Sequence, residues 1–297
     1  MGKCDAADLR CKHGPRLAEV PVASIRGPCR GQPSTPRLCC PAMLGISGST
    51  NVDFLPDEDA RAWVADGLRD HMVRLGEPAR RARVVTKTTI DEPRDLDDLF
   101  ELMCGVQREV GQGEVELTLL ELTEEDSPAR HGYEPLGDPT GQLMHTFAKR
   151  DDLVVVVVPQ LLRVAELTLA SVARELGRIA VYLAGGHQVE PSDVEGDAEL
   201  AAITLGLGVW IANGAYVYEN ACCGGGCGLD LRSMRAGLSM PEACFGLAVD
   251  SQRKGISRRA VAKHLQPNQR AAFKRSWGYV GKQPALTAAP QMAALGS

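Results

Sequence analysis

Two arginines and a glutamate at helical spacing are the side chains of this sequence best placed to do chemistry. Arg174, Glu175 and Arg178 occur in the segment Ala-Arg-Glu-Leu-Gly-Arg. Because a helix has 3.6 residues per turn, the two arginines project from one face with the glutamate beside them. A glutamate can act as a general base, whereas arginine stays protonated and has no lone pair for a metal. An ordinary solvated helix face, with Glu175 close to Arg178, has the same pattern.

The element that must carry these residues is a helix over residues 170–186. Four aliphatic residues recur at helical spacing and form one apolar stripe: Val172, Leu176, Ile179 and Leu183. Gly185 and Gly186 are suitable stop signals. The sequence therefore predicts an amphipathic helix that presents Arg174, Glu175 and Arg178 together.

A second candidate site is a glycine-rich segment with three thiols, Cys222, Cys223 and Cys227. Such thiols could hold a soft metal, with Cys244 or His187 as a further ligand. Their spacing is not a common structural zinc pattern, so a flexible loop between helices is the other interpretation. The proline-rich first 50 residues hold further thiols and one histidine, again without a Cys-x-x-Cys pair.

Composition indicates a soluble globular protein, with 44% hydrophobic and 24% charged residues. The net charge of −5 is uneven: residues 1–50 hold seven Lys/Arg and three Asp/Glu, and residues 251–297 hold nine Lys/Arg and no acid. An acidic body with basic ends favours self-association or an unknown protein partner. Stacking aromatics are scarce, and phosphate-binding glycine loops are absent from the sequence, so we expect neither nucleic acid nor nucleotide chemistry.

No signal peptide or membrane-spanning segment is evident, and we expect a cytoplasmic location with mostly reduced thiols. Four regions are predicted: a Pro/Cys-rich, poorly ordered arm (1–50), an α/β lobe (51–159), a helical lobe (160–281) and a disordered tail (282–297). The uniformly apolar run Leu153–Val158 predicts a strand covered on both faces.

The remaining pattern predicts an α+β fold in which a small mixed sheet precedes a helical lobe. We expect strands over 82–88, 114–122 and 143–149, and helices over 57–75, 97–110, 197–215, 239–252, 257–265 and 268–280. Ser239 and Glu242 form a capping-box pattern at the start of the 239–252 helix.

This order of elements resembles the gluzincin-like metallopeptidases, in particular an uncharacterised bacterial group. In those enzymes the corresponding segment is Ala-His-Glu-Leu-Gly-His, where two histidines bind zinc and the glutamate activates water. The resemblance covers residues 55–280 in outline and 165–250 at the level of motifs, including the Gly-Leu-Gly-Val segment from Gly206. It implies a zincin-like fold, with Glu175 at the general-base position.

The departure from that family concerns the metal. Arg174 and Arg178 stand at both histidine positions and cannot bind zinc. Glu195, Asp197 and Glu199 are the candidates for the downstream acid, and the sequence does not choose among them. The implied protein is a catalytically inactive scaffold or binding protein with no cofactor, in which guanidinium groups replace the metal and pair with Glu175 and a downstream acid. The alternatives are a zinc-dependent hydrolase that uses Glu175, His187, Cys222, Cys223 and Cys227, and a helical interaction module unrelated to peptidases.

Overall fold

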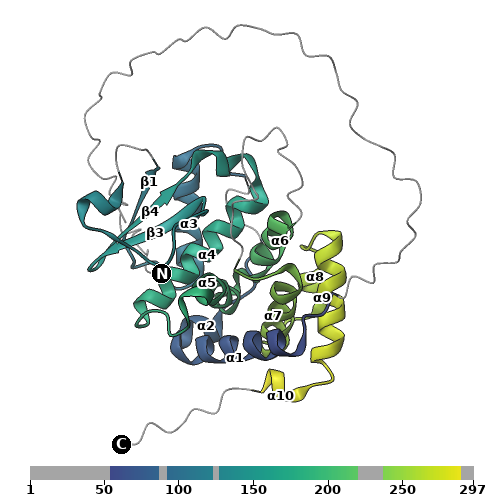
Figure 1. The fold of residues 1–297 in the computed structure, drawn as a ribbon. Coiled ribbons are helices and arrows are strands. Elements are labelled where there is room, and N and C mark those ends of the chain that lie inside the picture. The colour runs from purple at the N-terminus through teal and green to yellow at the C-terminus, as the bar shows by residue number, and fades with distance from the viewer. Residues whose placement is uncertain (1–53, 87–91, 123–126, 220–236, 289–297) are drawn as a thin grey trace, which may run out of the picture. The chain divides into compact units, whose positions relative to one another are not determined.

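The computed structural model describes residues 54–86, 92–122, 127–219 and 237–288, which belong to one compact unit (Figure 1). The fold is α+β. The helices are α1 (Glu58–Arg74), α2 (Glu77–Arg81), α3 (Leu96–Glu109), α4 (Ala165–Leu183), α5 (Val194–Ala202), α6 (Gly208–Glu219), α7 (Met240–Arg253), α8 (Arg258–Ala262), α9 (Pro267–Val280) and α10 (Pro284–Thr287). Short 3-10 turns are η1 (Pro128–His131), η2 (Pro159–Arg163) and η3 (Pro191–Asp193).

A small mixed sheet lies at one side of the helices (Figure 1). It is formed by β1 (Leu117–Glu121), β2 (Glu134–Pro135), β3 (Met144–Lys149) and β4 (Asp152–Val157), in the order β1-β4-β3-β2. β1 runs parallel to β4, and β3 runs antiparallel to both of its neighbours. The prediction that the valine-rich strand is covered on both faces is confirmed, because Val154 and Val155, which point to opposite faces, are both buried.

Helix α4 connects the sheet to the other helices. It packs against β3 on one side and against α5 and α6 on the other, and all of its residues from 170 to 181 are buried. A helix covered on all sides has few positions for charged residues unless each charge is paired. The two arginines and the glutamate of α4 are therefore parts of the core.

The apolar stretch after α5 does not continue as one regular helix. A π-helical turn, η4 (Ile203–Leu207), separates α5 from α6, and Gly206 within it has a φ of 91°. A β-carbon at Gly206 would lie 2.0 Å from the carbonyl oxygen of Arg83, so only glycine fits there. The single helix predicted over residues 197–215 is thus wrong in its middle.

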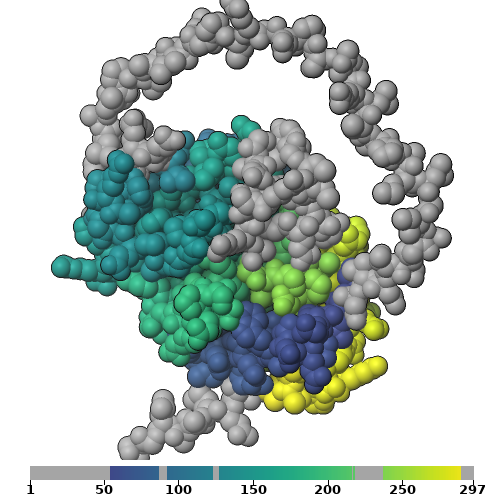
Figure 2. All heavy atoms as spheres, viewed as in Figure 1, coloured from purple at the N-terminus to yellow at the C-terminus, as the bar shows by residue number. Residues whose placement is uncertain are grey.

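The two ends of the described chain pack together. α1 packs against α7, and the guanidinium of Arg61 lies 4.7 Å from the centre of the Tyr279 ring. Figure 2 shows α1 and the C-terminal helices as neighbours on one face. The predicted α/β lobe (51–159) and helical lobe (160–281) therefore share one core, because the first helix of the former packs on the latter.

Among the other predictions from the sequence, one is confirmed and two are partly wrong. The capping box of Ser239 and Glu242 is present at the start of α7. The strand predicted over 82–88 is wrong for residues 82–86, which pair with no sheet strand; the amide of Val85 donates instead to the carbonyl of Gly206, at 2.9 Å. The predicted disordered tail (282–297) is wrong at α10, and the predicted arm (1–50) lies outside the described residues.

One described stretch, Pro191–Ala215, is long and apolar enough to cross a membrane, but 94% of its most apolar window is buried inside the protein. Core helices of folded proteins commonly have this property. Its burial against α4 and α7 accounts for its hydrophobicity.

Candidate functional site

The side chains of Arg174, Glu175 and Arg178 are buried at the contact between α4 and α5. The exposed fractions of these residues are 1%, 0% and 0%. A solvated helix face, which the sequence also allowed, is therefore wrong for these positions. A charged group in such surroundings must be paired or hydrogen-bonded, so the partners of each residue define the site.

Arg178 forms ion pairs with two carboxylates. Its Nε lies 3.0 Å from Oε2 of Glu175, and its Nη2 lies 2.7 Å from Oε2 of Glu195. Its Nη1 donates to the carbonyl oxygen of Leu136 at 2.6 Å. Each nitrogen of this guanidinium has an acceptor. The pKa of Arg178 is raised because, although burial alone would lower it, Glu175 and Glu195 outweigh that effect.

Arg174 makes a parallel set of contacts one turn earlier. Its Nε donates to Oε1 of Glu199 at 2.8 Å, and its Nη1 donates to Oε1 of Gln142 at 2.5 Å. The other oxygen of Glu199 accepts the amide of Leu238 at 2.7 Å. The amide of Gly237 also donates to Oε1 of Glu199, at 3.3 Å. Glu199 therefore links α4 to the residues just before α7, through one ion pair and two backbone hydrogen bonds.

Glu175 accepts most of its hydrogen bonds at one oxygen, Oε2. Its Oε2 receives the amide of Thr146 at 2.9 Å and the hydroxyl of the same residue at 2.8 Å, besides its contact with Arg178. Burial would raise the pKa of Glu175, but Arg178, His145, Thr146 and Arg174 outweigh it, and the pKa is lowered. This carboxylate is held ionised and shielded from solvent.

We define the Arg–Glu cluster as Arg174, Glu175, Arg178, Glu195 and Glu199. Within it, Arg178 pairs with Glu175 and Glu195, and Arg174 pairs with Glu199. The cluster carries three carboxylates and two guanidinium groups. The two guanidinium groups of the cluster cannot bind zinc, because they have no lone pair to donate to a metal.

A glycine sets the distance between the two helices that carry the cluster. A β-carbon at Gly177 would lie 2.1 Å from the carbonyl oxygen of Ala198 and 2.8 Å from the amide of Ala202. The backbones of α4 and α5 therefore touch at this point. That contact brings the glutamates of α5 within reach of the arginines of α4.

Asp197, the third candidate acid, lies outside the cluster. Its Oδ1 is 2.7 Å from Nε2 of His71 and its Oδ2 is 2.6 Å from Nδ1 of His187. Burial would raise the pKa of Asp197, but the hydrogen bonds with His187 and His71 outweigh it and lower the pKa. The sequence had no signal for His71, which lies 126 residues before its partner.

His145 is a further buried residue that sequence reasoning missed. It lies on β3, is 4% exposed, and neither ring nitrogen has a hydrogen-bond partner in the part of the chain that the structure describes. Its ring meets that of Phe147 edge-on at 5.5 Å. Burial lowers the pKa of His145, because a charged imidazole is disfavoured away from water.

The metal site that the sequence offered as an alternative is only partly described. Glu175 and His187 contact different partners, Arg178 and Asp197 respectively. Cys222, Cys223 and Cys227 lie outside the described residues. Within residues 54–219 and 237–288, apart from the gaps at 87–91 and 123–126, no three His, Cys, Asp or Glu side chains are arranged to hold a metal.

No protein-family model, curated protein or solved structure matches this chain. The geometry of its own residues must therefore carry any functional argument. The most informative part of that geometry is the Arg–Glu cluster.

Proposed function

We propose that this chain is a catalytically inactive, zincin-like cytoplasmic protein that acts as a scaffold or binding protein. The observation that supports it is the Arg–Glu cluster. At the positions where the resembled enzymes place zinc ligands, two guanidinium groups bind the carboxylates that would otherwise be left unpaired. Arg178 alone contacts Glu175 and Glu195 at 3.0 and 2.7 Å.

The surroundings of Glu175 argue against catalysis by this residue. A general base must reach a proton of the substrate or of an attacking water. Glu175 is 0% exposed, and one of its oxygens already receives three donors, from Thr146 and Arg178. Its lowered pKa also makes it a weak base. We therefore assign Glu175 a structural role as the acceptor that orders Arg178 against β3.

The partner is proposed to be another protein or a second copy of this chain. The support is the charge distribution, with an acidic body between basic ends. Light scattering coupled to size-exclusion chromatography, at low and at high salt, tests the second copy. A dimer that dissociates in high salt is expected, because screening weakens exposed charge pairs.

Restoring the metal ligands tests the proposed relation to zincins. In the double variant Arg174→His/Arg178→His, two imidazoles would stand one helical turn apart, with Glu195 and Glu199 nearby as acids. We expect this variant to bind about one zinc per chain, measured by elemental mass spectrometry and by a zinc-dependent rise in melting temperature. The control Arg174→Gln/Arg178→Gln should bind none.

The wild-type protein supplies the second measurement, which does not depend on whether the variant folds. Purified without a tag, it should contain almost no zinc, and zinc should not raise its melting temperature. About one zinc per wild-type chain would overturn the proposal and direct attention to Cys222, Cys223, Cys227 and His187. A folded double-histidine variant that binds no zinc would contradict the zincin-like framework.

A further inference from the structure

A pocket of about 470 Å³ lies between two parts of the chain. One part is the end of α2 with the segment after it, and the other runs from the end of α7 to just beyond α8. Of the eleven described residues that line it, five are Arg or Lys and none is acidic: Arg80, Arg81, Ala82, Arg83, Val84, Thr86, Lys254, Ile256, Ala260, Lys263 and His264. We call this site the basic pocket. Its volume is in the range of small-molecule sites.

The irregular backbone at Gly206 holds the segment after α2, whose residues line one side of the basic pocket. The carbonyl of Gly206 accepts the amide of Val85, and the missing β-carbon lets the backbone of Arg83 pass directly over it. The segment that carries Arg83 is thus held in place although it belongs to neither a helix nor a strand. Helix interruptions of the π type occur frequently at functional sites, because they expose backbone groups and redirect side chains.

Lys254 supplies a cation that is fixed in position. Its side chain is 7% exposed, and its Nζ donates to the carbonyl of Thr204 at 2.6 Å and lies 2.9 Å from Oδ2 of Asp250. An ammonium group has three N–H donors, so one remains for a ligand. Because Thr204 belongs to the same π-helical turn, the helix break positions both Lys254 and Arg83.

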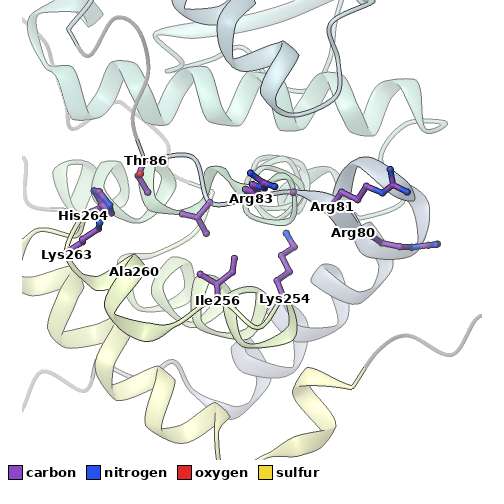
Figure 3. Close-up of a pocket in the computed structure, with 11 residues that line it drawn as sticks. Arg80, Arg81, Arg83, Thr86, Lys254, Ile256, Ala260, Lys263 and His264 are labelled. Atoms are coloured by element: carbon purple, nitrogen blue, oxygen red, sulfur yellow. The ribbon is translucent and has the colours of Figure 1, made fainter.

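The remaining cations extend the basic pocket in two directions. Figure 3 shows Lys254 and Ile256 rising from one side toward Arg83, with Arg80 and Arg81 at one end and Lys263 and His264 at the other. Arg81 is paired with Glu77 at the surface. Arg83 and Lys263 are exposed, and neither has a carboxylate partner within the described ranges. Their charges are therefore available to a ligand.

We propose that the basic pocket binds a small molecule that carries two or more phosphate groups. Guanidinium and ammonium groups are the usual protein ligands of phosphate. Lys254 and Arg83 at the centre and Lys263 at one end supply several cations, which fit linked anionic groups better than a single one. Apart from His264, no ring lines the pocket among the described residues, so recognition would rest on the phosphates and not on a stacked base. This proposal does not depend on the Arg–Glu cluster or on the proposed function.

Calorimetric titration of the full-length protein with tripolyphosphate at 150 mM salt tests the proposal. The variant Arg83→Gln/Lys263→Gln removes two exposed cations of the basic pocket and leaves the buried Lys254 intact. The matched control Lys274→Gln/Arg275→Gln removes two exposed cations of α9 and changes the net charge equally. We expect saturable binding by the wild type, at least tenfold weaker binding by the pocket variant, and a change of less than twofold in the control.

Three results would overturn it. Absence of saturable heat with the wild-type protein would show that the pocket does not bind oligophosphates. Equal weakening in both double variants would attribute binding to net charge and not to this pocket. Citrate, titrated in parallel, should bind more weakly than tripolyphosphate. Tighter binding of citrate would show that the pocket prefers carboxylates to phosphates. Melting temperatures of all variants ensure that each titration concerns folded protein.

Discussion

Nε of Arg178 lies 3.0 Å from Oε2 of Glu175, one turn earlier on the same helix, and neither side chain is exposed. A pair at this spacing on a protein surface contributes only a few tenths of a kcal/mol. In the core the energetics differ, because ions removed from water lose hydration that only complete pairing offsets. The contribution of this pair to stability is therefore best tested by removing one partner.

Arg178→Met should be strongly destabilising. The substitution leaves Glu175 and Glu195 buried without their cation, and breaking a buried pair in this way costs about 3–5 kcal/mol. Urea unfolding followed by circular dichroism measures the loss. Arg275→Met, an exposed position on α9, should change stability by no more than about 0.5 kcal/mol. A loss below about 1 kcal/mol for Arg178→Met would mean that water already reaches the cluster.

Stability should fall in acid because of Glu175. Its pKa in the folded protein is below the ordinary value of 4.5, so the stability it contributes is present above pH 4.5 and disappears as the pH falls below that value. In Glu175→Gln this dependence is absent. The difference in unfolding free energy between wild type and variant should therefore shrink from pH 6 to pH 3.5. The exposed Glu101→Gln serves as control, and a difference that grows in acid would reverse the assigned sign.

Asp250 should act in the opposite direction. Burial raises its pKa to about 6, with Lys254 opposing the shift. A raised folded-state pKa means that stability is lost as the pH rises from about 4 to about 6, by roughly 3 kcal/mol in total. Asp250→Asn should remove this loss, so the variant should gain stability relative to wild type between pH 4 and pH 6.5. The exposed Asp66→Asn should show no such trend, and a flat difference for Asp250→Asn would contradict the prediction.

Two glycines in helices should respond oppositely to alanine. At Gly177 the added methyl group would lie 2.1 Å from the carbonyl of Ala198, so α4 and α5 must separate at a cost of about 3 kcal/mol or more. At Gly105 in α3 the methyl group meets nothing within 4 Å, and alanine should stabilise the helix by about 0.5–1 kcal/mol. Thermal unfolding of both variants measures the contrast. Equal effects at the two sites would show that the helix contact can relax.

Periodicity was sufficient for the elements with regular patterns. The stripe around Leu176 predicted α4, and the run from Leu153 predicted a strand buried on both faces. The capping box at Ser239 located the start of α7 because its hydrogen bonds are local. In each case the structure depends on residues that are close together in the sequence, so their pattern is sufficient to predict it.

The sequence pattern did not predict the contacts between segments that are far apart in the chain. The polar residues of α5 all looked alike, but Glu195 and Glu199 face Arg178 and Arg174, whereas Asp197 faces His71. That division depends on how α5 packs between α1 and α4. The break at Gly206 was missed for a similar reason: glycine is common in apolar helices, and only the backbone of Arg83 explains its positive φ.

The close approach at Gly177 has a consequence for how this chain can vary. The lengths of the ion pairs made by Arg174 and Arg178 depend on the separation of two backbones, and that separation depends on the smallest residue of α4. A larger residue at 177 would move Glu195 and Glu199 away together and leave several buried charges uncompensated at once. We therefore expect a viable change at Gly177 to be accompanied by changes at the charged residues of the Arg–Glu cluster.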